Sequence, residues 1–152
     1  MGLVRSIAAV FSRFARRSST SSEPPSADPR HLLGRRGERI AARHLRRLGY
    51  KVLYRNYRAP NGGEVDIVCR DRDTLVFVEV KTRTSDAFGA PAEAVTPSKQ
   101  RLIARGALAW LRLLGNPDIY YRFDIVEIRV TGKKTEAGVI RNAFTLPEPY
   151  RD

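Results

Sequence analysis

The segment Gly63-Glu-Val-Asp-Ile-Val-Cys-Arg70, followed eight residues later by Val78-Glu-Val-Lys81, decides the fold of this chain. Both pieces alternate apolar and polar side chains, which is the period of a half-buried β-strand. The four residues between the strands, Asp71-Arg-Asp-Thr74, are typical of a turn. The segment therefore predicts an antiparallel hairpin with strands at 64–70 and 75–81.

Strand alternation predicts which side chains of this hairpin share a face. Glu64 and Asp66 fall on one face of the first strand, and Val65 and Ile67 fall on the other. Cys69, the only cysteine, occupies an apolar position, so we expect a small buried side chain rather than a reactive thiol. A single cysteine also excludes an intrachain disulfide and a cysteine-based metal cluster, and a reducing, cytoplasmic location is the default expectation.

The expected register brings carboxylates face to face. If the turn is symmetric about its two central residues, Asp66 lies directly opposite Glu79, and Glu64 lies opposite Lys81. Like charges placed directly opposite each other destabilise a hairpin unless something else gains by the arrangement. A divalent cation such as Mg²⁺, which prefers oxygen ligands and keeps several waters, would supply that gain.

Two interpretations of these carboxylates follow from spacing. In the first, the cation polarises a phosphodiester and supplies hydroxide near neutral pH, while Lys81 holds the attacking water or stabilises the transition state. In the second, the charged side chains form ordinary surface ion pairs, each worth about 0–1 kcal/mol. The carboxylates lie on a strand pair that must pack against other elements on both faces, which favours the first interpretation. Spacing alone leaves both interpretations open.

Composition narrows the class of partner. The 152 residues suit one folded domain, and the net charge is +12. Residues 31–152 carry +9 of this charge, so the folded part is basic in its own right. A basic domain suggests nucleic acid first and an anionic membrane or acidic protein second, with a merely soluble cationic surface as the alternative.

Residues 1–30 differ in composition from the rest, so we expect an extension at 1–30, a domain at 31–146 and a short tail at 147–152. Residues 1–17 combine apolar residues at helical spacing with arginines, and a Ser- and Pro-rich linker follows. Such a segment suits an organelle transit peptide or a basic helix that docks on anionic lipid or nucleic acid. The simplest interpretation is a poorly ordered extension, and we do not expect membrane contact through residues 1–17.

The remaining pattern predicts an α/β domain with the element order αβββαββ. A first helix is expected from about Leu33 to Leu48, with Glu38 at the edge of its inward face, and a second from about Pro97 to Leu114. There the Glu38 carboxylate would either stabilise the start of the helix or reach a site over the sheet. Further strands are expected at residues 51–58, at 120–130 and, more weakly, at 139–144.

These residues resemble a known family. Asp66 followed by Glu79-Val-Lys81 is similar to the PD-(D/E)XK signature of restriction-endonuclease-like nucleases, with Val65 in place of the usual proline. More narrowly, residues 31–130 resemble the YraN family of bacterial proteins, relatives of archaeal Holliday-junction resolvases. The matching pieces, in order, are Leu33-Gly-Arg-Arg-Gly-Glu38, Leu48-Gly-Tyr50, Arg55-Asn-Tyr57, Gly63-Glu-Val-Asp-Ile67, Phe77-Val-Glu-Val-Lys-Thr-Arg83, Phe88-Gly89, Lys99-Gln100 and Arg122-Phe-Asp124.

The resemblance implies a central mixed sheet flanked by helices, and a Mg²⁺ site on Asp66, Glu79 and Glu38, where Mn²⁺ would substitute. Lys81 would be the catalytic lysine, and Gln100 would match a glutamine that some of these nucleases carry on the following helix. A helix-start polar residue without catalytic function is the alternative for Gln100. The residues expected to contact nucleic acid are Arg35, Arg36, Arg83 and Lys99, and Glu64 is expected to support the site by pairing with Lys81.

The leading functional hypothesis is therefore a Mg²⁺-dependent endonuclease acting on DNA, including branched DNA. Junction-resolving relatives suggest a homodimer by analogy, and the sequence does not distinguish DNA from RNA. Two alternatives stay open: a nucleic-acid-binding module of the same fold without cleavage, and a membrane-associated adaptor that uses the N-terminal helix.

Overall fold

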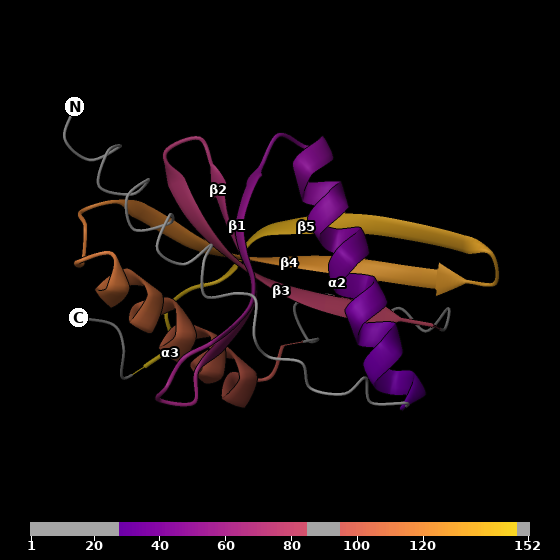
Figure 1. Ribbon diagram of the computed structural model, residues 1–152, viewed down its shortest axis with the longest axis horizontal. Helices are drawn as coiled ribbons and strands as arrows, with labels where there is room; N and C mark the ends of the chain where they lie inside the picture. The colour runs from indigo at the N-terminus through magenta and orange to yellow at the C-terminus, as the bar shows by residue number, and fades with distance from the viewer. Residues whose placement is uncertain (1–27, 85–94, 149–152) are drawn as a thin grey trace.

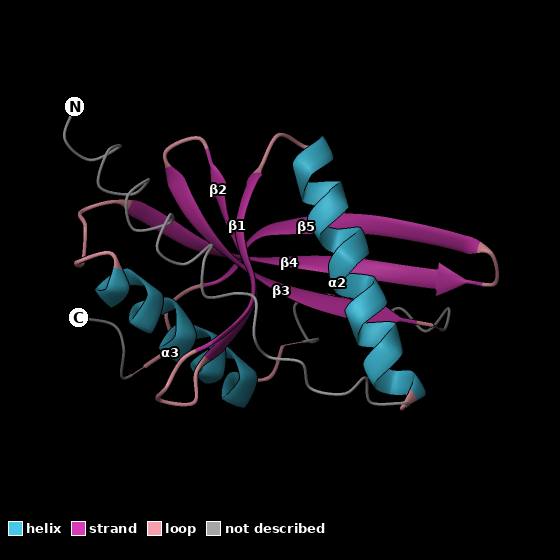
Figure 2. Cartoon of the chain, viewed as in Figure 1, coloured by secondary structure: helices cyan, strands magenta, loops and turns pink. Residues whose placement is uncertain are grey.

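The computed structural model describes residues 28–84 and 95–148. The described residues follow the predicted order αβββαββ. Five strands form one sheet in the order β1-β2-β3-β4-β5, antiparallel except for the β3–β4 pair. Figures 1 and 2 show helix α2 (Pro29–Arg47) lying across strands β3, β4 and β5, whereas helix α3 (Pro97–Leu113) lies apart from it. The strand bounds are Lys51–Arg58, Glu64–Asp71, Thr74–Arg83, Tyr120–Thr131 and Lys134–Phe144.

Helix α2 spans Pro29–Arg47 and begins four residues before the expected Leu33. The side chain of Asp28 accepts a hydrogen bond from the Arg30 amide at 2.9 Å, and Pro29 takes the first helical position, where its missing N–H costs nothing. The boundary expected at residue 31 therefore falls inside this helix. Because Glu38 is now in the third turn, its expected role at the helix start is wrong, and only a position facing the sheet remains.

The predicted hairpin register is confirmed over most of its length. Paired Cα positions run from Asp71–Thr74 to Ile67–Val78, with Arg72 in the left-handed conformation at a φ of 56°. The two-residue turn fixes this register. The burial pattern fixes it as well, because a slip by one residue would move the apolar side chains of a strand to the opposite face.

Two hydrophobic cores cover the two faces of the sheet. Helix α2 packs Ala41, Ala42 and Leu45 against one face, together with strand residues that include Val76 and Val78. The other core is built on helix α3, which spans Pro97–Leu113. The molecule is therefore a helix–sheet–helix sandwich, consistent with the restriction-endonuclease-like core that the sequence predicts.

Helix α3 begins where the sequence predicts. The Thr96 hydroxyl accepts a hydrogen bond from the Lys99 amide at 3.2 Å, and Pro97 follows it. Trp110 is 1% exposed, and its ring centroid lies 5.0 Å from that of Tyr57, so this side chain belongs to the core. Tyr57 is itself buried, so it does not offer a free surface for stacking bases.

Two glycines bring helix α3 and strand β2 into backbone contact. A Cβ on Gly63 would lie 2.2 Å from the Gly106 nitrogen, and one on Gly106 would lie 2.9 Å from the Glu64 nitrogen. Neither distance is compatible with a side chain. This close approach fixes the start of β2, and with it the position of the acidic residues that follow.

Strand β5 is longer than expected, because it begins at Lys134 rather than at residue 139. The tight turn after Thr131 lets β5 pair with β4 at once, from Thr131–Lys134 onward. Cys69 is fully buried, as predicted, and burial raises the pKa of its thiol to about 12. Within the described residues, neither helix combines the length and apolar character needed to cross a bilayer.

Candidate metal and nuclease site

The candidate site lies where strand β2 leaves strand β3. Cα pairing between these strands ends at Ile67–Val78, one position short of the predicted Asp66–Glu79 pair. Beyond that point the Val80 amide donates a hydrogen bond to Asp66 Oδ2 at 2.8 Å, so a side chain takes the place of the backbone partner. The Asp66 carboxylate therefore lies in the opening between the two strands.

The predicted alternation of β2 is wrong at this point. Val65 is buried in the core under α3, whereas Ile67 is buried in the core under α2, although both were expected on one face. On the neighbouring strand Asn56 adopts a φ of 55°, and Tyr57, paired with Val65, also lies on the α3 side. The strand pair thus twists through Asp66, which lets acids from both sides of the sheet approach it.

Glu79 meets Asp66 from the α3 side. Its side chain is 5% exposed on a central strand. Burial and the adjacent Asp66 carboxylate, which is in hydrogen-bond contact with it, raise the pKa of Glu79 to about 8. Without a cation, Glu79 therefore retains its proton near neutral pH, because burial and the neighbouring Asp66 carboxylate both disfavour its charged form.

Two lysines flank the buried Glu79. Lys81 Nζ lies 3.6 Å and Lys99 Nζ 3.7 Å from Glu79 Oε1. Lys99 also donates a hydrogen bond to Glu64. Burial opposes the charged form of Lys99, but Glu64 and Glu79 outweigh it and raise the pKa of this lysine. The expected support of Lys81 by Glu64 is therefore wrong, because β2 has left β3 and Glu64 pairs with α3 instead.

Glu38 approaches Asp66 from the α2 side. Burial, followed by the charge of Asp66, raises the pKa of Glu38. Helix α2 comes this close because Gly37 lies against Thr82: a Cβ on Gly37 would be 2.0 Å from the Thr82 hydroxyl oxygen. Glu38 follows Gly37 directly in the chain, so the same approach of α2 to the sheet brings its carboxylate near Asp66.

This donor set fits a hard divalent cation held by two carboxylates. Within the part of the chain that the structure describes, no three acidic, histidine or cysteine side chains converge on one point. Asp66 and Glu79 are in contact, however, and Mg²⁺ is usually held by one or two carboxylates, with waters and substrate oxygens completing its shell. Glu38 is a neighbour of Asp66 rather than a member of the same cluster.

Two of the other predicted site residues, Gln100 and Arg83, contact groups other than the Asp66 and Glu79 carboxylates. The Gln100 side chain donates a hydrogen bond to the Val95 carbonyl at 3.2 Å, which anchors the segment before α3. Arg83 Nε lies 3.4 Å from Glu127 Oε1. Arg35 and Arg36 are exposed on α2. The motif Phe88-Gly89 and residues 1–27 lie outside the described residues.

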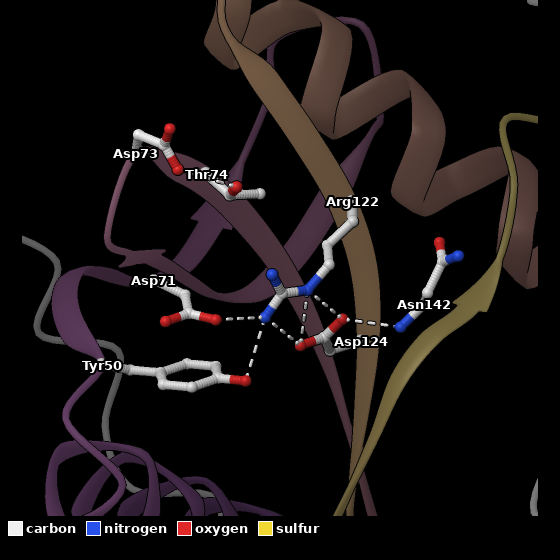
Figure 3. Close-up of polar contacts among 7 residues, drawn as sticks. All are labelled: Tyr50, Asp71, Asp73, Thr74, Arg122, Asp124 and Asn142. Atoms are coloured by element: carbon white, nitrogen blue, oxygen red, sulfur yellow. Dashed lines mark hydrogen bonds and ion pairs between the residues drawn. The ribbon is translucent and has the colours of Figure 1, made fainter.

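A second polar cluster, centred on Arg122, lies on the α2 side of the sheet (Figure 3). Its guanidinium binds Asp124 through Nε at 3.0 Å, Asp71 through Nη2 at 2.9 Å and the Tyr50 hydroxyl through Nη2 at 3.0 Å. Asp124 is fully buried and also accepts a hydrogen bond from the Asn142 amide at 2.9 Å. The cluster therefore links β2, β4, β5 and the connection between α2 and β1.

The backbone explains why Asp124 belongs in this cluster. Register shifts between β4 and β5 at this point, so that one residue of β4 faces three residues of β5, and Asn142 adopts a φ of 51°. The freed Asn142 amide finds its acceptor in Asp124. Sequence reasoning assigned no role to Asp71 or to this bulge, because nothing local signals a contact between residues 51 positions apart.

Comparison with known proteins finds relatives that share about half of their residues with this chain. A protein of family UPF0102 from Geobacter sulfurreducens is 51% identical over 116 residues, which cover 76% of this chain and 90% of the relative. Relatives from Geobacter metallireducens and Desulfosudis oleivorans are 49% and 44% identical, over 75% and 76% of this chain and 93% and 91% of their own length. The model described as "Uncharacterised protein family UPF0102" matches residues 37–128, which contain Glu38, Asp66, Glu79 and Lys81. The chain therefore belongs to the uncharacterised protein family UPF0102, the YraN family that its motifs indicate.

Proposed function

We propose that this protein is a Mg²⁺-dependent nuclease that hydrolyses phosphodiester bonds in DNA, including branched DNA. The observation that carries the proposal is the contact between Asp66 and the buried Glu79, with Lys81 and Lys99 beside them. A fold gains nothing from two carboxylates in contact on a central strand. A cation bound between them would turn this cost into a binding site.

Asp66 and Glu79 would hold the metal, which when bound would polarise the phosphodiester and lower the pKa of a coordinated water. The chain supplies the rest of the arrangement. The Val80 amide holds the Asp66 carboxylate in place, and Lys99 bridges Glu64 and Glu79. The Glu38 carboxyl, with its raised pKa, is suited to accept or donate a proton beside Asp66.

Lys81 has the position expected of a transition-state contact. Its ammonium group lies 3.6 Å from Glu79 and its side chain is 31% exposed, so it reaches both the buried carboxylate and an incoming phosphate. A positive charge placed where the phosphorane-like transition state gains negative charge typically contributes about 10²–10³-fold in rate. Arg83, two residues further along β3, would contact the neighbouring phosphate.

The experiment is a cleavage assay with Mg²⁺ or Mn²⁺ on linear duplex, single-stranded and four-way-junction DNA, with RNA in parallel. Asp66→Asn and Glu79→Gln each replace one carboxyl ligand by an uncharged amide of nearly the same shape. Asp73→Asn, in the exposed hairpin turn, is the matched control for charge.

We expect metal-dependent cleavage by the wild type and the control, and a loss of at least about 100-fold in both site variants. No metal-dependent cleavage of any substrate, or equal cleavage by Asp66→Asn, would overturn the proposal. Binding without cleavage would assign the protein to the nucleic-acid-binding modules instead.

A further inference from the structure

A basic groove runs along the outer side of helix α2, away from the carboxylates. It encloses about 550 Å³ between the helix and the start of strand β5. Its lining residues are Arg36, Arg39, Ile40, Arg43, His44, Arg47, Thr135 and Ala137. No acidic residue lines the groove, although the chain as a whole contains 16.

Helical geometry makes the arginines of this groove a continuous row. Arg36, Arg43 and Arg47 are separated by seven and four residues, spacings that return to the same side of an α-helix. At about 100° per residue, Glu38 points roughly 160° away from Arg36, which places it toward Asp66 on the opposite side. One helix therefore separates the candidate metal site from the groove.

The groove arginines differ from the basic residues near the carboxylates. Lys81, Arg83 and Lys99 each lie within 4 Å of a carboxylate oxygen of this chain. Within residues 28–84 and 95–148, by contrast, Arg36, Arg43 and Arg47 have no acidic side chain within that distance. Three adjacent like charges without internal neutralisation destabilise the free protein, and an external polyanion would relieve this cost.

The dimensions and lining favour a nucleic-acid backbone over a lipid surface. Arg36 and Arg47 are eleven residues apart, or about 16 Å along the helix, which matches the axial rise of about five phosphates of one duplex strand. A helix that docks on lipid inserts large apolar side chains, and only the half-buried Ile40 and Ala137 are apolar in this groove.

We propose that this groove binds the phosphate backbone of a nucleic-acid segment other than the one presented to Asp66 and Glu79. The helix between the two sites prevents one short, straight segment from occupying both. A nucleic acid that folds or branches around α2 would contact both sites at once. The proposal depends on the proposed function for the choice of nucleic acid as the polyanion, but binding in the groove does not require cleavage.

The test is a fluorescence-anisotropy titration of labelled 30-base-pair duplex and four-way-junction DNA in EDTA, where no cleavage occurs. The groove variant Arg43→Gln/Arg47→Gln is compared with Arg72→Gln/Arg112→Gln, which loses the same charge at exposed positions outside the groove. Thermal unfolding of both variants verifies that they are folded. Vesicles containing phosphatidylserine are titrated in parallel.

We expect the groove variant to bind junction DNA at least about 10-fold more weakly at 0.1 M salt than the control variant. The slope of log K against log salt should be shallower by about 1.8, the value for two lost phosphate contacts. Equal weakening by the two variants would show a general charge effect and overturn the proposal. So would unchanged DNA affinity, or a loss confined to vesicle binding.

This outcome is distinguishable from failure of the proposed function. A groove-dependent loss of binding in a protein that never cleaves would refute the nuclease and leave the groove assignment standing. Cleavage that depends on Asp66, together with unchanged binding by the groove variant, would support the nuclease and refute the groove assignment.

Discussion

Asp66 Oδ2 accepts a hydrogen bond from the backbone amide of Val80 at 2.8 Å, so a side chain of β2 completes the strand ladder that the backbone of β2 has left. The same carboxylate is in contact with Glu79 and lies beside Glu38. One residue thus has both a structural and a chemical role, and the two can be separated by substitution.

Asp66→Asn and Asp66→Ala should differ in stability although both remove the charge. The asparagine oxygen can still accept the Val80 hydrogen bond, whereas alanine leaves that amide without its acceptor. We expect Asp66→Ala to be less stable than Asp66→Asn by about 1–3 kcal/mol in urea-induced unfolding. Equal stabilities would show that the hydrogen bond contributes nothing to the stability of the fold. Neither variant should cleave DNA.

Gly106→Ala should destabilise the protein although alanine is the better helix former. The new Cβ would lie 2.9 Å from the Glu64 nitrogen and 3.0 Å from the Val65 side chain, and backbone contact leaves no room for adjustment. We expect a loss of about 1–3 kcal/mol, together with a shift of Glu64 away from Lys99. Gly34→Ala, in α2, is the matched control because its Cβ would meet nothing within 4 Å, and it should gain about 0.5–1 kcal/mol. Similar effects of the two substitutions in thermal unfolding would contradict the close approach.

Stability without metal should fall as the pH rises through neutrality. The folded-state pKa of Glu79 is raised by burial and by Asp66 to about 8, whereas its ordinary value is 4.5. Between these values the folded protein binds a proton that the unfolded chain has lost, so the free energy of unfolding decreases with pH. The stabilising contribution is full below about pH 4.5 and is lost by about pH 8, with a slope of at most about 1.4 kcal/mol per pH unit.

The measurement is urea unfolding in EDTA from pH 5 to pH 9, and Glu79→Gln is the comparison because it removes the titrating group. Glu79→Gln should show a flatter profile and exceed the wild type in stability above pH 8. Parallel profiles for the two proteins would contradict the raised pKa of Glu79. Added Mg²⁺ should restore stability to the wild type at high pH and have no such effect on the variant.

The Arg122–Asp124 pair should show strong coupling. Arg122→Met leaves the fully buried Asp124 carboxylate without its ion partner, which typically costs about 3–5 kcal/mol. Asp124→Leu in the same chain removes the stranded charge, so the double variant should be more stable than Arg122→Met. A double-mutant cycle in urea should give a coupling energy of at least about 1 kcal/mol, and additive effects would contradict the ion pair in Figure 3.

The elements that were predicted correctly are those determined by residues close together in the sequence. The hairpin register followed from a two-residue turn, and the start of α3 followed from Thr96 and Pro97. The start of α2 was wrong although Asp28 and Pro29 signal it, because the polar composition around them resembles a linker. The early start of β5 depends on pairing with β4, which the polar sequence after Lys134 does not indicate.

The residues of the candidate site were also predictable only where nearby sequence determines their positions. Asp66, Glu79 and Lys81 could be singled out because their spacing along two paired strands places them together. The partner of Glu64 could not, because Lys99 lies 35 residues away on a helix whose position depends on the contact between two glycines. The departure of β2 from β3 is likewise a tertiary effect: twist and packing against α3 override the strand alternation.

The account depends most directly on one cation shared by Asp66 and Glu79. Crystals of the wild type and of Asp66→Asn, soaked in MnCl₂ and measured at the manganese absorption edge, would locate it by anomalous scattering. The account predicts one peak in the wild type, about 2.0–2.3 Å from an oxygen of each carboxylate, and no peak in Asp66→Asn. No manganese between these two carboxylates in the wild type, or a peak that persists in Asp66→Asn, would contradict it.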